Sequence, residues 1–349
     1  MAEKKPTLEE WKRLYAVAKQ VKELAPWDWM MEDDVFGVQN PASDEIGFIS
    51  VMGAAGEHFA VALYPGAEAL YAFLELEEQG REGLLDDVAP DRVLEIPQFQ
   101  ASFEDRELLQ KEDREVIKKL NLKFRGQNEW PMFRSYAPGM FPWFVSSDEA
   151  RFLTFALEQL LEVAPRVRDD DSILASEDDE DFLVRTPRQE NNRIIWEDKL
   201  TRVPEPEKKA VTPAPLDANQ IEALKRLPKA ENVIEAELSM LPAPVQEKKG
   251  RPFFPYLLMI ADAQSGMILA NEMLQPMPSL AAMRAELPLK LAAHLSQLGA
   301  IPDTIAVRNE TMADLLSPLA AELDIQIIQS RVLPAVDRAL EFMTRMTPF

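Results

Sequence analysis

The sequence predicts two folded regions of different class: an α+β region with an antiparallel sheet over residues 1–203, and an α/β region with a mixed five-stranded sheet over residues 217–349. Between them, residues 204–216 are rich in proline and charge, which favours an extended linker that buries little surface. Before this linker, strand-like runs are joined by short polar turns. After it, three strand-like runs precede alternating strand and helix patterns, an order typical of a mixed sheet covered by helices.

Length and composition agree with this division. The chain has 349 residues, of which 46% are hydrophobic and 28% are charged, enough for two domains with separate cores. No uninterrupted apolar run reaches the roughly 18 residues of a membrane span. The lysines near the N-terminus precede no apolar segment, so we expect no signal peptide and a cytoplasmic location.

The formal net charge of −22 disfavours nucleic-acid binding, because an acidic surface repels phosphates, and it gives no attraction to anionic membranes. Residues 229–349 hold 10 Lys or Arg against 14 Asp or Glu, which leaves room for a local basic surface. Zero cysteines exclude disulfides and thiolate metal sites, and His58 and His294 are too few for a histidine-rich zinc site. Carboxylates must therefore carry any metal chemistry.

The first region opens with a helix over 7–24, where Thr7 and Glu10 form a capping-box pattern and apolar residues recur at helical spacing. Strands 46–52 and 58–64 follow, joined by a glycine-containing hairpin loop. The further elements expected are helix 67–79, strand 98–103, helix 107–120, edge strands 130–136 and 142–144, helix 147–163 capped by Ser146 or Ser147, and strands 182–185 and 193–197. Together they predict helices packed on an antiparallel sheet.

An aromatic and acidic loop follows the first helix and contains Trp27, Asp28 and Trp29. Two large rings so close together favour side chains that fill the core where the helix meets the sheet, and a ligand-stacking platform is the alternative. Arg134, on a predicted edge strand, is interpreted as the partner of a carboxylate, again with ligand binding as the alternative. Trp27, Asp28, Trp29 and Arg134 are the candidate ligand-binding residues of this region.

Two further patterns favour structural interpretations. The loop from Gly53 to Gly56 lacks the lysine and the strand-to-helix context of a phosphate loop, and His58 beside it is interpreted as a structural histidine. The acidic loop 166–181 lacks the glycine and the terminal glutamate of a calcium-binding loop, so we interpret it as a solvated loop.

The second region centres on a hairpin over 256–273, in which two apolar runs flank a polar turn. The Asp262 side chain can bond to nearby backbone, and Gly266 tolerates a positive φ. The expected elements are helix 217–227, strands 233–238, 256–261 and 267–273, helix 280–298, strand 304–307, helix 311–323, strand 325–329 and helix 334–346. Pro288 predicts a kink in the helix that it interrupts, or a later start for it.

This order of elements resembles the ribonuclease H-like fold, and residues 255–266, with their Asp-Ser turn, resemble the second-strand hairpin of integrase and transposase cores. The resemblance covers about the last third of the chain. It implies carboxylates on the first strand, just after the fourth strand and on a late helix, which hold two divalent cations. The residues matched by position are Glu237 or Glu235, then Asn309, then Asp337 or Glu341.

The match departs from the family at its centre. Asn309 carries no charge and cannot supply the anionic bridge between two cations, and Glu237 replaces the usual aspartate. We therefore expect a non-catalytic binding or interaction protein with a degenerate ribonuclease H-like domain, a protein or small-molecule partner and no cofactor. The alternative is a nuclease or phosphoryl-transfer enzyme that holds Mg²⁺ or Mn²⁺ with Glu237, Glu310 and Asp337.

Several longer strings point to relatives along the whole chain. They are Pro26-Trp27-Asp28-Trp29-Met30, Glu45-Ile46-Gly47-Phe48 with Val51-Met52-Gly53, Ala101-Ser102-Phe103-Glu104-Asp105-Arg106, Trp130-Pro131-Met132-Phe133-Arg134-Ser135-Tyr136 and Asp148-Glu149-Ala150-Arg151-Phe152. Through these strings the chain resembles an uncharacterised bacterial family of paired domains of unknown function. The resemblance implies relatives and brings no activity with it.

Overall fold

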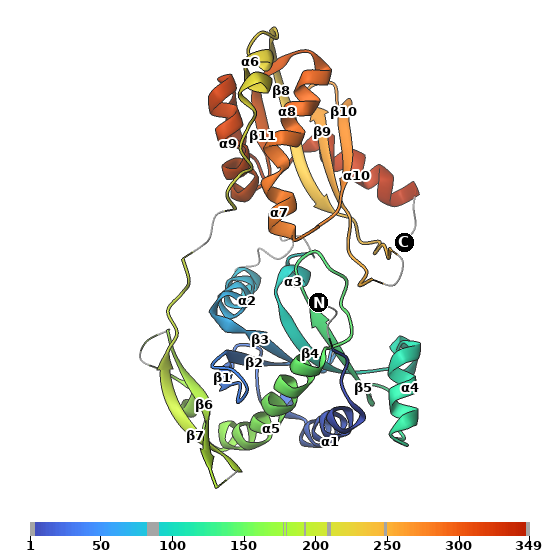
Figure 1. Ribbon diagram of the computed structural model, residues 1–349, viewed down its shortest axis with the longest axis vertical. Coiled ribbons are helices and arrows are strands. Elements are labelled where there is room, and N and C mark those ends of the chain that lie inside the picture. Colours follow the sequence, from blue (N-terminus) through green and yellow to red (C-terminus); the bar gives the residue numbers. More distant parts are fainter. Residues whose placement is uncertain are drawn as a thin grey trace. The chain divides into compact units, whose positions relative to one another are not determined.

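The computed structural model describes residues 4–81, 91–176, 178, 180–191, 193–207, 211–247 and 250–346 (Figure 1). The chain divides into two compact units. The first holds residues 1–137 and 142–207, and the second holds residues 208–349 together with the short segment Pro138–Phe141. Glu177 and Asp179 of the expected acidic loop, and residues 208–210 of the expected linker, lie outside the described residues.

The first unit is built on a seven-stranded sheet in the order β5-β4-β3-β2-β1-β6-β7. The strands are β1 (Phe36–Gln39), β2 (Ile46–Met52), β3 (Ala60–Pro65), β4 (Gln98–Glu104), β5 (Trp130–Tyr136), β6 (Asp181–Glu190) and β7 (Arg193–Arg202). Five neighbouring pairs are antiparallel, but β1 and β6 run parallel, so the expected antiparallel sheet is in fact mixed. A parallel neighbour requires a crossover, and the long helix that precedes β6 provides it.

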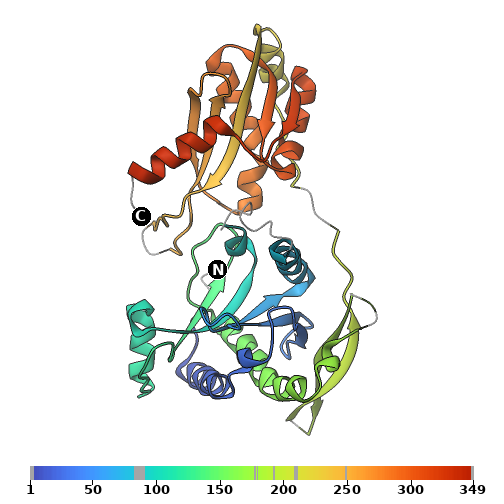
Figure 2. The same ribbon diagram turned by 180° about the vertical axis from the view of Figure 1, so that it is seen from behind.

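Helices cover both faces of this sheet. They are α1 (Leu8–Leu24), α2 (Gly66–Arg81), α3 (Asp91–Glu95), α4 (Lys111–Lys119) and α5 (Ser147–Asp169), with short 3₁₀ turns at Pro26–Asp28, Arg106–Leu108 and Asp171–Leu174. Figures 1 and 2 show α1 and α5 on one side of the sheet and α2 on the other. The larger core lies under α1 and α5, and the smaller one lies under α2 around Phe48, Tyr64 and Phe73.

Local sequence signals explain where α1 and α5 begin. Thr7 and Glu10 make the expected capping box of α1, and Ser146 and Glu149 make the equivalent box of α5. Helix α5 packs closely on β2, because a Cβ atom at Gly47 would lie 2.8 Å from the Phe152 ring. The helix runs to Asp169 rather than to residue 163, so the first residues of the expected acidic loop are helical.

One expected strand is absent as a strand. Residues 142–144 form only an isolated bridge, in which Trp143 pairs with Ser135 of β5. The prolines that suggested an edge strand limit this segment to a single pair, because proline cannot donate to a ladder.

The second unit is built on a five-stranded sheet in the order β10-β9-β8-β11-β12. The strands are β8 (Lys229–Met240), β9 (Tyr256–Asp262), β10 (Ile268–Leu274), β11 (Ile301–Val307) and β12 (Gln326–Gln329). Strands β8, β9 and β10 are antiparallel neighbours, whereas β11 runs parallel to both β8 and β12. The mixed five-stranded sheet expected from the sequence is confirmed.

Five helices complete the described part of this unit: α6 (Ala218–Leu224), α7 (Leu280–Ala285), α8 (Leu287–Leu298), α9 (Glu310–Leu323) and α10 (Pro334–Met346). Helices α6 to α9 pack on the larger core, and α10 packs on the opposite face against Leu257, Met259 and Ala306. The expected helix 280–298 is two helices that meet at Glu286, with Pro288 in the first turn of the second. Proline fits that position because it lacks only an N–H that has no partner there.

The β9–β10 hairpin has the turn that its sequence predicts. The Asp262 carboxylate accepts hydrogen bonds from the Ser265 N–H and hydroxyl, both at 2.7 Å, and Gly266 adopts a φ of +72°. Within the described residues, every helix is too short or too polar to cross a lipid bilayer.

Candidate functional site

Two carboxylates lie buried on one face of β8. Glu235 and Glu237 are two residues apart on a strand, so both side chains leave the same face of the sheet, and they are 2% and 5% exposed. This is the face that α10 covers. A buried carboxylate requires hydrogen bonds or an opposite charge, and the partners of these two differ.

Glu235 is the anchor of a helix N-terminus. Its Oε2 atom accepts the backbone N–H groups of Ala335 at 2.8 Å and of Val336 at 2.9 Å, in the first turn of α10. These N–H groups have no partner within the helix, and the positive end of the helix dipole favours a carboxylate there. The side chain therefore holds α10 against β8.

Glu237 and Asp337 converge on one arginine. Arg308, which directly follows β11, donates from Nε to Glu237 at 3.2 Å and from Nη2 to Asp337 at 2.5 Å. Its Nη1 donates to the carbonyl oxygen of Arg331 at 2.6 Å. The second oxygen of Asp337 accepts the N–H of Leu333 at 3.1 Å. A guanidinium thus occupies the space between a first-strand carboxylate and a carboxylate of the last helix.

The other matched positions lie elsewhere. Asn309 is the N-cap of α9, and its Oδ1 accepts the Met312 N–H at 3.0 Å, which gives the amide a structural use. Glu310 and Glu341 are exposed residues of α9 and α10. In the part of the chain that the structure describes, no three acidic or histidine side chains form a group that could hold a metal ion.

Arg308 is the residue that the sequence interpretation missed. The resemblance places an acid just after the fourth strand, at the position of Asn309, which is one residue later. The signal that could have found Arg308 is a charged residue directly after the buried run of β11, since side chains at the end of a central strand lie beside those of its neighbours.

The two tryptophans after α1 contact other residues of the first unit. Trp27 is 6% exposed, and its ring lies 5.1 Å from Phe59 and 5.5 Å from Phe103. The Lys22 ammonium lies about 5 Å from all three rings. Trp29 donates its indole N–H to the carbonyl of Ala164 at 2.9 Å, whereas Asp28 is exposed.

Arg134 lies in a buried ion pair. Its two terminal nitrogens contact the two oxygens of Asp113 at 3.0 and 2.6 Å, and the side chains are 5% and 7% exposed. Nη1 also donates to the carbonyl of Phe133, and the guanidinium lies 4.8 Å from the Phe144 ring centroid. Because Asp113 also accepts the Gln110 N–H that begins α4, the pair joins β5 to that helix.

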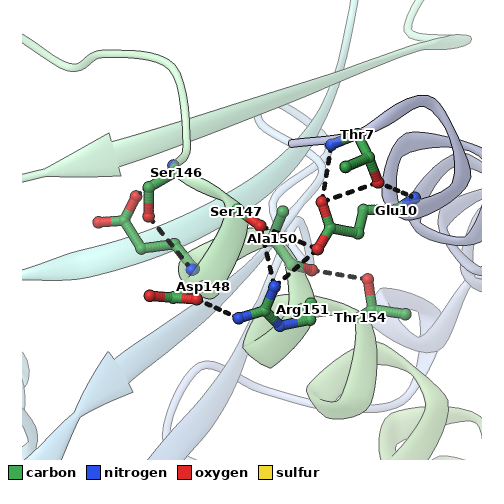
Figure 3. Close-up of polar contacts among 9 residues, drawn as sticks. Thr7, Glu10, Ser146, Ser147, Asp148, Ala150, Arg151 and Thr154 are labelled. Atoms are coloured by element: carbon green, nitrogen blue, oxygen red, sulfur yellow. Dashed lines mark hydrogen bonds and ion pairs between the residues drawn. The ribbon is translucent and has the colours of Figure 1, made fainter. Parts of the chain in front are cut away.

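A polar network joins the starts of α1 and α5 (Figure 3). Glu10 accepts from the Thr7 N–H at 2.7 Å, from the Ser147 hydroxyl at 2.8 Å and from Arg151 at 2.7 Å. Burial opposes ionisation of Glu10, but these hydrogen bonds outweigh it and lower its pKa to about 2. The sequence showed the Thr7 capping box and the string that contains Arg151, but not that Glu10 connects them.

A pair of acids lies between α2 and the loop before β1. Burial, followed by the charge of Glu32 and a hydrogen bond to it, raises the pKa of Glu77 from 4.5 to about 7. Arg81 of the same helix forms an ion pair with Asp33 at 2.6 Å and only partly offsets this rise. A carboxylic acid that stays protonated near neutral pH makes the stability of this unit depend on pH.

We expect Glu77→Gln to stabilise the first unit at pH 8 and to leave it unchanged at pH 4.5. A raised folded-state pKa gives stability that is complete below pH 4.5 and is lost as pH rises through about 7. Because Glu77 is only partly buried, solvent screening reduces the expected gain to about 1 kcal/mol. Urea unfolding at the two pH values measures it. The exposed neighbour variant Glu78→Gln is the control, and an equal effect of both variants at pH 8 would refute the assignment.

Two pockets of the second unit lie away from the buried carboxylates. One, of about 670 Å³, is lined by Glu231, Asn232, Val233, Ala263, Gln264 and Asp303. The other, of about 420 Å³, lies among residues 213–225 with Pro318 and Glu322. Neither is lined by Glu237, Arg308 or Asp337, so this cluster is a packed ion-pair network rather than the floor of either pocket.

The fold and these sites define a two-unit α/β protein with two mixed sheets. The chain belongs to the family described as domain of unknown function DUF7309, whose model matches residues 11–185. A second model, domain of unknown function DUF6930, matches residues 220–344. The expected pairing of two domains of unknown function is confirmed.

No curated protein sequence matches the chain. Among solved structures, the crystal structure of the Mos1 strand transfer complex aligns with 13% identity and a TM-score of 0.25. The alignment covers 54% of this chain and 58% of that chain, so it spans less than two thirds of the Mos1 protein. A TM-score of 0.25 is too low to indicate a shared fold or function.

Proposed function

We propose that the chain is a non-catalytic binding protein whose second unit is a degenerate ribonuclease H-like domain. The strand order β10-β9-β8-β11-β12, with three antiparallel strands and two added in parallel, supports the fold. The observation that carries the proposal is Arg308, whose guanidinium bonds to Glu237 and Asp337. In the ribonuclease H-like family that this unit resembles, carboxylates at the matched positions hold divalent cations.

The residues of the cluster do not fit a pair of divalent cations. A divalent ion about 4 Å from a guanidinium is repelled by roughly 8 kcal/mol at an effective dielectric constant of about 20. Arg308 already neutralises one of the two negative charges and bonds to an oxygen of each carboxylate. Binding of a metal would therefore require the arginine to leave both of its partners.

The alternative, a nuclease or phosphoryl-transfer enzyme, needs Glu237, Glu310 and Asp337 to share cations. Two of these residues meet through Arg308, while Glu310 begins α9 beside the cap Asn309. The net charge of −22 favours a protein or small-molecule partner over nucleic acid. A binding role is therefore the function that the cluster supports best.

Manganese titration tests this proposal. In calorimetry of the full chain, we expect millimolar Mn²⁺ to move the Tm of the second unit of the wild-type protein by less than about 1 °C. Arg308→Ala removes the guanidinium that bonds to both carboxylates, so its Tm is lower without metal and rises by several degrees with Mn²⁺.

The double variant Arg308→Ala/Glu237→Ala is the control and should lose this response. A clear rise of the wild-type Tm with Mn²⁺ that Glu237→Ala abolishes would overturn the non-catalytic proposal and favour the metal-dependent enzyme.

A further inference from the structure

Among the described strands, β7 is the last of the larger sheet, and one of its edges is paired with no other strand. Strand β7 stands at the end of the strand order, and its ten residues pair with β6. Strand β6 pairs with β1 only at Val184 and Arg185, so in the described residues the rest of the β6–β7 hairpin is two-stranded (Figures 1 and 2). Such an edge presents backbone N–H and C=O groups that can pair with another strand.

The side chains of this edge are apolar and charged in a repeating order. Arg193, Ile195 and Glu197 share one face of β7 because side chains alternate along a strand. Ile194 and Ile195 are 37% and 39% exposed, and Arg193 and Glu197 are exposed beside them. On the opposite face Trp196 contacts Phe155 of α5, which fixes the orientation of the strand.

We propose that β7 pairs antiparallel with β7 of a second copy of this chain, about a two-fold axis at Ile195. In this register, Arg193 lies opposite the partner's Glu197, and the symmetric pair repeats this contact. Ile195 lies opposite the partner's Ile195, and Ile194 lies opposite the partner's Trp196. Each pairing joins residues of the same face, as an antiparallel sheet requires.

The charges of β7 select a second copy and this register. Moving the axis to Trp196 sets Arg193 opposite the partner's Lys199, and moving it to Glu197 sets two glutamates opposite each other. Like charges directly opposite are unfavourable, whereas opposite charges are favourable. Within one copy, Glu197 forms an ion pair with Arg188 of β6 at 3.0 Å. In the proposed dimer, positive and negative side chains would therefore alternate across the joined sheets.

The β6–β7 hairpin is close to neutral, unlike the rest of the chain, which is strongly acidic. Residues 181–202 carry five Lys or Arg and four Asp or Glu, within a chain of net charge −22. The edge can therefore approach its copy without strong local repulsion. Because the contact is a single strand pair, its area is small, and we expect a dissociation constant of about 10–100 µM.

Sedimentation equilibrium of the full chain tests the pairing from about 1 to about 500 µM. The wild-type protein should form dimers across this range. Arg193→Glu and Glu197→Arg each place two like-charged pairs in the interface and should weaken dimerisation by at least about tenfold. An equimolar mixture of the two variants should restore it, because the mixed dimer pairs Glu with Arg at both positions.

Lys199→Glu is the matched control, with the same charge change on the same face of β7 and outside both ion pairs. It should change the dissociation constant by less than about twofold. A wild-type protein that stays monomeric throughout overturns the proposal. It is also overturned if Lys199→Glu weakens dimerisation as much as Arg193→Glu, or if the mixture associates no better than each variant alone. Because a monomeric wild-type protein alone rejects the pairing, the test does not depend on every variant folding.

Discussion

Replacing Arg134 with methionine is expected to lower the free energy of unfolding of the first unit by about 3–5 kcal/mol. The substitution leaves the Asp113 carboxylate buried without its opposite charge, and removing one partner of a buried pair costs far more than the pair itself contributes. The six tryptophans all lie in the first unit, so urea unfolding followed by tryptophan fluorescence measures this effect.

Arg13→Met provides a matched control for burial. Arg13 contacts both oxygens of Glu158 at 2.8 and 2.6 Å and lies 4.8 Å from the Phe155 ring centroid, as Arg134 does from Phe144. Its side chain, however, is 52% exposed, so we expect a loss below about 1 kcal/mol. Arg134→Met/Asp113→Leu should recover part of the loss. Equal losses for Arg13→Met and Arg134→Met would contradict a structural role for the buried pair.

The second large effect is expected from Glu235→Leu, which should destabilise the second unit by about 2–4 kcal/mol. Leucine fills the space but leaves the N–H groups of Ala335 and Val336 buried without an acceptor. Hydrogen exchange at these two amides should accelerate, and calorimetry should show a lower Tm for the second unit. Asp337 lies on the same helix, so Glu235 also positions the carboxylate that contacts Arg308.

Two further variants separate the anchoring role of Glu235 from general effects. Glu235→Gln keeps an oxygen acceptor and loses only the charge at the helix N-terminus, so its cost should be about 1 kcal/mol. Glu231→Leu makes the same substitution at an exposed position of β8 and should stay within about 0.5 kcal/mol of the wild type. If Glu235→Leu were as mild as Glu231→Leu, the carboxylate would not anchor α10.

Local signals explain which parts of the fold the sequence predicted. The Thr7 capping box, the polar turn at Asp262 and the apolar runs that flank it act within a few residues, and the structure shows the helix and hairpin that they indicate. The parallel pairing of β1 with β6 was not predictable in the same way. It joins Gly37 to Val184 through a connection that includes strands β2 to β5, and neither strand contains a local signal for so distant a neighbour.

For the candidate site, too, the sequence predicted the positions of single residues, and only the fold showed which of them meet. The sequence predicted Glu237 on the first strand of the second region and Asp337 on the last helix, with Asn309 where the resemblance implies an acid after the fourth strand. The meeting of both carboxylates at Arg308 depends on contacts across 71 and 29 residues of sequence. The same holds for Arg134, whose carboxylate partner was expected but could be identified as Asp113 only from the fold.

By itself, the sequence determined most of the elements and their order, the lack of cysteine and the acidic balance of the chain, because periodicity, caps, turns and composition are local or additive properties. The tertiary structure alone decided that the sheet of the first unit is mixed, that Glu235 caps a helix and that a guanidinium lies between Glu237 and Asp337. The physical reason is that strand neighbours and the partners of buried charges are selected by burial and electrostatics among residues distant in sequence.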